Sequence, residues 1–238
     1  MRDCIVVIPT YNEVNTISPL VTKLISMGYS CLIVDDSSPD GTGDLADVIA
    51  SNFSLAHVLH RENGRGYAGA VRDGFNWSLA RTNFTRIAQI DADGSHPAEK
   101  LPEMLRAAED RHLVIGSRYV EGGGLDTDWP VWRKALSQFG NAYARLLLGL
   151  WSEVRDLTGG FRVWDRDLLR SALKFPIQSN GYVFQIETAY IAIQELGCSF
   201  QEIPIYFRER SAGESKMCLE VQLEAARRVI ELRRHYAL

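Results

Sequence analysis

The stretch that decides the fold is Cys4–Glu13, CIVVIPTYNE, where an apolar, β-branched run ends abruptly in polar side chains. A short apolar run bounded in this way is typical of a buried β-strand. Similar runs follow along the chain and predict further strands at Leu32–Asp35, Ala56–Leu59, Ile87–Ile90 and Leu113–Ser117. The chain is therefore expected to build its core around a sheet.

Helices are predicted between these strands, because apolar residues there recur about every 3.6 positions. The segments are Ile17–Met27, Thr42–Asn52, Ala68–Ala80 and Pro97–Glu109. Alternation of strand and helix favours a mostly parallel sheet flanked by helices on both faces, so the predicted fold class is α/β.

After residue 118 this alternation loosens. We expect a Gly-rich loop, a helix, a Thr-Gly-Gly turn, a second helix, a late strand and a terminal helix: 121–128, Trp132–Leu148, 158–160, the region around Val183–Leu196, Ser199–Tyr206 and Leu219–Tyr236. No Pro- or Ser-rich linker and no internal repeat interrupts the sequence. A single domain over residues 1–238 is therefore expected.

Composition excludes several classes of protein. The chain has 238 residues, 46% hydrophobic and 24% charged, which is ordinary globular usage. A net charge of −4 argues against a general nucleic-acid binder, which would carry a basic face. The four cysteines form no CxxC pair and no zinc set, which favours a reducing, cytoplasmic compartment. We expect no signal peptide, and only peripheral membrane contact, because the longest apolar stretch, Ala142–Trp151, is too short to span a bilayer.

Polar residues follow the predicted strands at the edge where parallel α/β sheets bind ligands. Asp91 and Asp93 come directly after the run Ile87–Ile90, and Asp93 is expected on an exposed strand-end loop. Two carboxylates at positions i and i+2 suit a hard divalent ion that also binds phosphates. An ordinary Asp-rich turn has the same pattern. Because polar groups also follow the first, second and fifth strands, we favour a site for Mg²⁺ or Mn²⁺.

The second strand ends in Asp35 and Asp36. Asp36 is predicted to accept hydrogen bonds from a base or ribose, as acidic residues do in other nucleotide folds. We interpret 40–42 as a turn and helix cap. The segment Gly64–Gly69 lacks the full GxGxxG pattern and follows the third strand, which indicates a tight turn rather than a dinucleotide site.

Seven motifs together resemble the family 2 inverting glycosyltransferases, in particular the dolichyl- and polyprenyl-phosphate mannose synthases of the bacterial polyprenol monophosphomannose synthase type. They are Ile8–Glu13, Val34–Thr42, Asp91–Pro97, Gly116–Tyr119, Thr158–Arg162, Gly181–Gln185 and Arg210–Lys216. The resemblance implies a GT-A fold, which is a Rossmann-like sheet flanked by helices. It also implies metal-dependent transfer of mannose from GDP-mannose to a polyprenyl monophosphate, with inversion at the sugar.

The resemblance also implies residue roles. Contacts to the nucleotide sugar would come from Pro9, Tyr11, Asn12, Glu13, Val34, Asp36, Asp91, Ala92, Asp93, Arg210 and Lys216. The metal would bind Asp91, Asp93 and Ser95, although many relatives carry Gln in place of Ser95. The acceptor phosphate would bind Arg118, Arg133 and Ser137. The catalytic set would be Asp93, Arg118, Arg133, Arg210 and Lys216, the last two on a closing loop. Residues 1–118 would form the donor and metal half, and 119–238 the acceptor half.

The acceptor itself indicates the mechanism. A phosphate monoester has a second pKa near about 6 and needs little help from a general base at neutral pH. Glu187 would orient a sugar hydroxyl or act as a buried cap. Two other functions remain open: transfer from UDP-glucose or another UDP-hexose, and a catalytically silent nucleotide-sugar-binding scaffold for a membrane partner.

Two surfaces are candidates for lipid contact. The terminal helix is basic and amphipathic, a pattern that fits either a membrane surface or packing on the domain. The apolar residues Trp129, Trp132, Phe139, Leu146–Leu148 and Trp151 fit either prenyl-chain contact or core. Some relatives end in transmembrane helices that this sequence does not contain. The expected location is the cytoplasmic face of the membrane, reached directly or through a partner protein.

Overall fold

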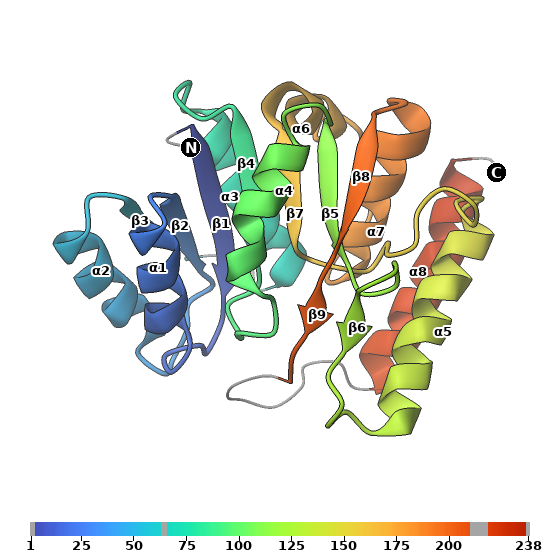
Figure 1. Cartoon of the computed structure of the whole chain (residues 1–238), viewed down its shortest axis with the longest axis horizontal. Helices are drawn as coiled ribbons and strands as arrows, with labels where there is room; N and C mark the ends of the chain where they lie inside the picture. Colours follow the sequence, from blue (N-terminus) through green and yellow to red (C-terminus); the bar gives the residue numbers. More distant parts are fainter. Residues whose placement is uncertain (1–2, 63–65, 210–218, 237–238) are drawn as a thin grey trace.

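A seven-stranded sheet in the order β3-β2-β1-β4-β7-β5-β8 forms the centre of the computed structural model (Figure 1). The structure describes residues 3–62, 66–209 and 219–236, without the side chains of 219–223. The predicted runs form β1 (Cys4–Thr10), β2 (Ser30–Asp35), β3 (Ala56–His60), β4 (Arg86–Gln89) and β5 (Leu113–Ser117). The late strand divides in two: β8 (Phe200–Pro204) joins the sheet, and β9 (Tyr206–Phe207) pairs with β6 (Gly124–Leu125).

The predicted helices are all present, with small shifts at their ends. They are α1 (Ile17–Ser26), α2 (Thr42–Asn52), α3 (Tyr67–Leu79), α4 (Leu101–Ala107) after the 3₁₀ turn η1 (Ala98–Lys100), α5 (Val131–Leu147), α7 (Val183–Tyr190) continued by the π-helical η2 (Ile191–Glu195), and α8 (Leu219–His235). The short α6 (Arg166–Ala172) was not predicted. Along the described residues, no helix combines the length and apolar character needed to cross a membrane.

The strand β7 (Arg162–Asp165) is the main departure from the predicted architecture. It runs antiparallel between β4 and β5, with Trp164 opposite both Ile87 and Leu113. The other strand pairs of the sheet are parallel, so the prediction of a mostly parallel α/β sheet is confirmed. Because β7 is antiparallel, it begins at the edge where the parallel strands end, and this brings the Thr-Gly-Gly turn to that edge.

Both faces of the sheet are covered, which explains why its strands are apolar without alternation. Ile5 and Val7 of β1 pack on the side of α3, α6 and α7, whereas Val6 and Ile8 pack on the side of α1, α2 and α4. Figure 1 shows these two helical layers, with α1 and α4 in front of the sheet and α3 behind it. The sheet is therefore a rigid platform from which the strand-end loops project.

Candidate functional site

The carboxyl ends of β1, β2, β4 and β5 lie at one edge of the sheet and carry most of the predicted site residues. The chain runs outward from β1 to β3 and then returns to β4 on the other side of β1. Ligands of open α/β sheets bind at such a switch point, because two neighbouring loops diverge there. The two loops here contain 11–13 after β1 and 91–93 after β4.

Asp91 is held by the hydroxyl of Tyr67. This hydroxyl donates a 2.7 Å hydrogen bond to Asp91 Oδ1 and accepts bonds of 2.9 and 2.7 Å from the side-chain amides of Gln89 and Gln185. The Tyr67 ring stacks on the Tyr182 ring, with 5.0 Å between their centroids. Burial, followed by the charge of Asp91, raises the pKa of Tyr67 well above 10. Tyr67 therefore remains a donor to the carboxylate at neutral pH.

The second oxygen of Asp91 lies against His96, and Gly160 closes on the same carboxylate. His96 Nε2 is 3.2 Å from Asp91 Oδ2, and the His96 ring packs edge-on against Phe207. A Cβ at Gly160 would lie 3.0 Å from the Tyr67 oxygen and 3.1 Å from both Asp91 carboxylate oxygens. Glycine therefore allows the Thr-Gly-Gly turn to approach the carboxylate closely.

Asp93 is buried, with a relative exposure of 4%, so the expectation that it lies on an exposed loop is wrong. Its Oδ1 accepts hydrogen bonds from the Ser95 backbone N–H at 3.0 Å and the Ser95 hydroxyl at 2.6 Å. Ala92 and Ser95 are buried as well. In this arrangement the Ser95 hydroxyl orients Asp93, and its predicted role as a metal ligand remains a prediction.

The loops after β1 and β2 contain Asn12 (φ 58°) and Ser37 (φ 56°), the two non-glycine residues of the described chain with left-handed backbone. Such conformations cost free energy and often occur at functional sites. The Asn12 N–H donates to Ser38 Oγ at 3.1 Å, and the Glu13 N–H donates to Thr42 Oγ1 at 2.9 Å. These bonds join the two loops into one wall of the site.

Asp36 has protein partners on both carboxylate oxygens. Arg61 donates to Oδ1, and the Gly66 N–H donates to Oδ2 at 2.6 Å. Arg61 also bonds Asp73 at 2.7 Å, so Asp36 belongs to a charged network that sequence reasoning did not find. The predicted ribose or base contact of Asp36 stays a prediction. The other predicted nucleotide contacts lie at the same strand ends, partly or fully buried: Pro9, Tyr11 and Val34.

The Arg118 side chain donates two hydrogen bonds of 2.8 Å to Asp156, from Nε to Oδ2 and from Nη2 to Oδ1. Nη2 also donates to Thr158 Oγ1 at 2.6 Å. Burial by itself lowers the pKa of Arg118 and raises that of Asp156. The opposite charges and hydrogen bonds of the pair outweigh burial, so the Arg118 pKa is raised and the Asp156 pKa lowered. Among the described residues Nη1 makes no hydrogen bond, so it is the nitrogen on which the predicted phosphate contact depends.

Arg133 and Ser137 lie on α5. Arg133 Nη1 donates to both carboxylate oxygens of Glu209 at 2.8 Å, and its guanidinium stacks on Trp129, 3.6 Å from the ring centroid. The Ser137 hydroxyl bonds the Tyr119 hydroxyl at 2.7 Å. A carboxylate therefore already occupies Nη1 of Arg133.

An open pocket of about 470 Å³ connects Arg118 with α5, and its lining includes Tyr119, Lys134 and Gln138. Glu187 lies elsewhere: it is buried and accepts the N–H groups of Gln178 at 3.0 Å and Ser179 at 2.7 Å. This geometry favours the capping interpretation of Glu187. The predicted closing-loop residues Arg210 and Lys216 lie outside the described residues.

The carboxylates that follow β4 suit a divalent ion whose coordination is completed by substrate. Within the described parts of the chain, no group of three or more His, Cys, Asp or Glu side chains is arranged to hold a metal. Mg²⁺ and Mn²⁺ at nucleotide sites need less, because one or two carboxylates suffice when substrate phosphates and water complete the coordination. Asp91 and Asp93 fit that requirement.

Comparison with known proteins identifies the family. The Glycosyl transferase family 2 profile matches residues 5–173. An undecaprenyl-phosphate mannosyltransferase of Micrococcus luteus is 43% identical over 213 residues, 89% of this chain and 86% of that protein. A polyprenol monophosphomannose synthase of Mycolicibacterium smegmatis is 41% identical over 220 residues, 90% of this chain and 80% of that protein.

A solved structure supports the fold. Glucosyl-3-phosphoglycerate synthase from Mycobacterium tuberculosis, in complex with Mn²⁺, UDP and phosphoglyceric acid, superimposes with a TM-score of 0.68 at 20% identity. The match covers 96% of this chain and 76% of that one, and at this identity it bears on the fold alone. Profile, relatives and fold agree, and the chain belongs to glycosyl transferase family 2.

Proposed function

We propose that the protein transfers mannose from GDP-mannose to a polyprenyl monophosphate and produces polyprenyl-phosphate mannose. One observation carries the proposal. The paired carboxylates Asp91 and Asp93 end β4 at the switch point of the sheet, in a chain 43% identical to a protein named for mannosyl transfer to undecaprenyl phosphate. Residues 1–118 form the donor half in this proposal, and residues 119–238 form the acceptor half.

Asp91 and Asp93 would hold Mg²⁺ or Mn²⁺ together with the donor diphosphate. Tyr67 and His96 fix the two oxygens of Asp91, and Ser95 fixes one oxygen of Asp93. Carboxylates oriented by neighbouring hydrogen bonds lose little further freedom when they bind a cation. A bound divalent ion supplies positive charge that stabilises the departing diphosphate.

The acceptor phosphate would enter the pocket between Arg118 and α5. Arg118 and Lys134 are the basic residues that line this pocket, and Arg133 lies on the same helix as Lys134. An oxygen of the phosphate dianion attacks the anomeric carbon and forms the new bond. The bond from that carbon to the GDP oxygen breaks, and GDP leaves with the electron pair. The dianion has no proton to lose, so no residue need act as a general base.

Two further parts of the proposal rest on the resemblance. Arg210 and Lys216 would close over the phosphates after the donor has bound. The enzyme would work at the cytoplasmic face of a membrane, because a polyprenyl phosphate is anchored there by its chain.

A nucleotide competition experiment tests the choice of donor. With Mn²⁺ present, calorimetry should give tighter binding for GDP than for UDP, and Asp93→Asn should weaken GDP binding. Tighter binding of UDP would instead favour the UDP-hexose alternative. Binding of both nucleotide sugars without turnover on any prenyl phosphate would favour the silent scaffold.

A further inference from the structure

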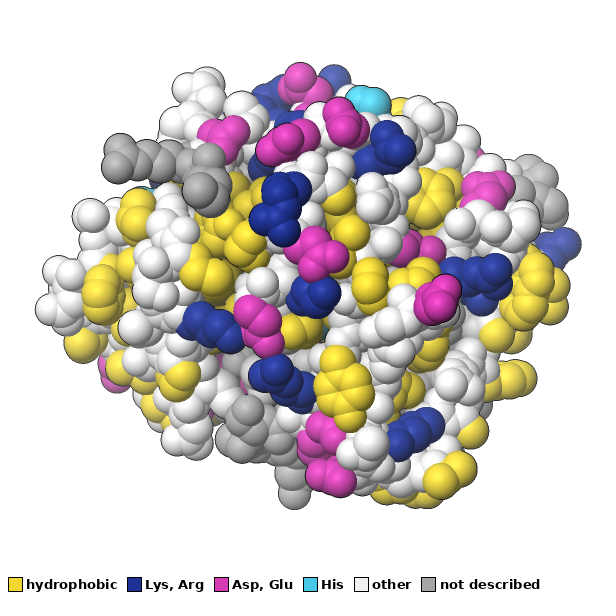
Figure 2. Space-filling model, viewed as in Figure 1, with side chains coloured by type: hydrophobic (Ala, Val, Ile, Leu, Met, Phe, Trp, Pro, Cys, Tyr) yellow, Lys and Arg dark blue, Asp and Glu magenta, His cyan; other side chains and the backbone are white. Residues whose placement is uncertain are grey.

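Large exposed hydrophobic side chains concentrate on one helix. Val131, Trp132, Phe139 and Leu146 of α5 are 82%, 67%, 68% and 65% exposed, and Trp151 just beyond the helix is 52% exposed. We call these five residues the outer face of α5. Trp132, Phe139 and Leu146 are separated by seven positions, about two helical turns, so they form a stripe. Figure 2 shows hydrophobic side chains along the right-hand edge, which α5 occupies in Figure 1.

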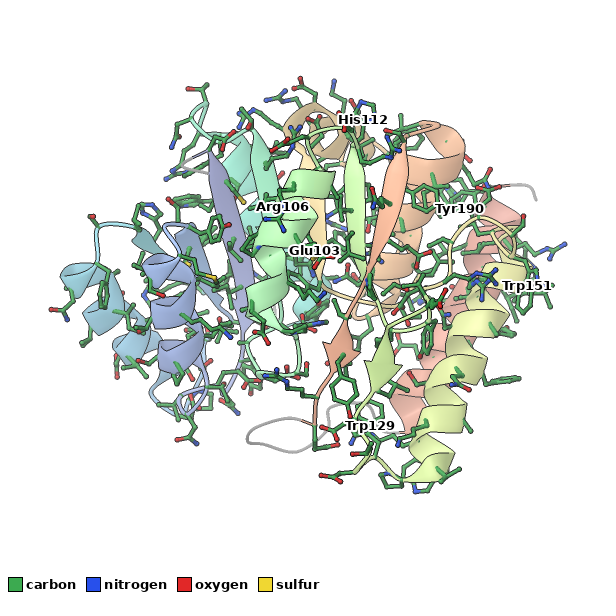
Figure 3. The ribbon with its side chains drawn as sticks, in the orientation of Figure 1. Glu103, Arg106, His112, Trp129, Trp151 and Tyr190 are labelled. Carbon is green, nitrogen blue, oxygen red and sulfur yellow. The ribbon has the colours of Figure 1, made fainter. Side chains whose placement is uncertain are left out.

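The helix is nevertheless firmly attached to the domain by its opposite face. Asn141 and Ala144 are buried, and the Tyr143 hydroxyl donates to the Ala226 carbonyl at 3.1 Å. The exposed stripe is therefore not the result of a detached helix. The apolar residues that the sequence left open between core and lipid contact divide into two groups. Trp129 is buried at the start of α5, whereas Trp151 is exposed beyond its far end (Figure 3).

The terminal helix α8 is the less suitable of the two predicted lipid surfaces. Val229 and Leu232 of α8 are each 2% exposed and pack in the core. Arg227 and Arg228 are paired with Glu231. Within residues 224–236 these apolar and charged side chains are thus already used within the protein, and Ile230 is the large hydrophobic side chain that stays exposed, at 39%.

Charge distinguishes the outer face of α5 from an ordinary apolar patch. From Trp129 to Trp151 the sequence contains no Asp or Glu, in a protein whose net charge is −4. Its basic residues are Lys134, Arg133, which is paired with Glu209, and Arg145, which is buried. Exposed Trp and Phe beside basic side chains are typical of helices that lie on an anionic lipid surface. A second copy of this chain would place two such segments together, and neither has an acidic residue with which to pair the other's Lys134, which argues against self-association.

We propose that the outer face of α5 is the surface by which the protein binds an anionic lipid bilayer. The inference rests on the proposed function, because a lipid-linked acceptor is the reason for the protein to bind a membrane. Arg133 lies next to Trp132 in the sequence, and Lys134 lines the acceptor pocket. A helix lying on the bilayer by Trp132 and Phe139 would hold that pocket at the depth of the lipid phosphates. The membrane would then contribute to positioning the acceptor.

Vesicle flotation tests the proposal directly. The protein should float with vesicles of phosphatidylcholine and phosphatidylglycerol more than with phosphatidylcholine alone, and salt should weaken the binding. The double variant Trp132→Ser/Phe139→Ser should bind more than about tenfold more weakly, because it loses both aromatic contacts with the interface. The matched control is Val48→Ser/Phe53→Ser, which removes exposed apolar side chains from the region of α2. This control should bind as the unaltered protein does.

Activity measurements separate this inference from the proposed function. The Trp132→Ser/Phe139→Ser enzyme should keep its turnover with a short, water-soluble prenyl phosphate and lose it with a long-chain acceptor in vesicles. Unchanged flotation of this variant, with its fold verified by circular dichroism, would overturn the inference. So would a dimer in solution that the variant disrupts without any change in vesicle binding. Failure of the unaltered protein to act on either acceptor, with flotation intact, would contradict only the proposed function.

Discussion

Replacement of Tyr67 by Phe removes a single oxygen from beneath the proposed metal site. Asp91 loses a hydrogen bond of 2.7 Å, and the amide nitrogens of Gln89 and Gln185 lose their acceptor. Both glutamines are buried, and each unsatisfied amide costs about 1–3 kcal/mol, so we expect the two together to cost about 2–6 kcal/mol of stability. Partners that orient metal ligands contribute about 10–100-fold to metal affinity, so Mn²⁺ should bind the variant more weakly by that factor.

The assay is calorimetric titration of Mn²⁺ in the presence of GDP, with thermal unfolding of each protein measured alongside. Tyr190→Phe is the matched control, because its buried hydroxyl also bonds a carboxylate, Glu195 Oε1 at 3.1 Å. Tyr190 lies on α7, and Figure 3 shows it on the far side of β8 from the sheet centre. The control should lose stability but keep its Mn²⁺ affinity. If Tyr67→Phe also keeps full Mn²⁺ affinity, Tyr67 is only structural and the account of Asp91 is wrong.

Three further predictions concern charged residues. Asp93→Asn should reduce transfer by at least about a hundredfold while the melting temperature changes little, since the amide preserves the shape that accepts the Ser95 bonds; normal turnover would refute its metal role. Asp156→Asn should cost about 3–5 kcal/mol of stability, because Arg118 is left as an uncompensated buried charge. The pKa of Asp156 is lowered in the folded protein. The stability that the unaltered protein has over the variant should therefore be complete above the ordinary Asp pKa of 3.8 and decline as pH falls through the lower folded pKa. Urea unfolding at a series of pH values measures this difference. Arg133→Ala should raise the KM for prenyl phosphate and leave GDP affinity unchanged; an equal loss of GDP affinity would place Arg133 in the donor site.

The sequence was sufficient for those elements whose signal is local. The runs that became β1 to β5 are apolar because both faces of the sheet are covered, and this is visible without knowledge of any partner. Asp91 and Asp93 could be singled out because they follow β4 directly. The helix over 132–148 was recognised from its period, and the structure places its ends within one residue of that prediction.

The parts that escaped prediction depend on contacts between distant positions. The strand β7 has only four residues, includes Arg162 and Asp165, and acquires its identity by pairing with β4 and β5. Tyr67 and Asp91 are 24 positions apart, and Arg118 and Asp156 are 38 apart. No periodicity or local motif reports such a pairing, because it is set by how the loops meet at the sheet edge.

The most direct test of the proposed function uses labelled donors and a phase separation. The protein is incubated with GDP-mannose labelled in the sugar, a polyprenyl phosphate and Mn²⁺, and the lipid is extracted into an organic solvent. We predict that label enters the organic phase only when all components are present, that Asp93→Asn transfers none, and that labelled UDP-glucose gives no lipid product. Label that stays in the aqueous phase with the unaltered protein, or that reaches the lipid only from UDP-glucose, would contradict the account.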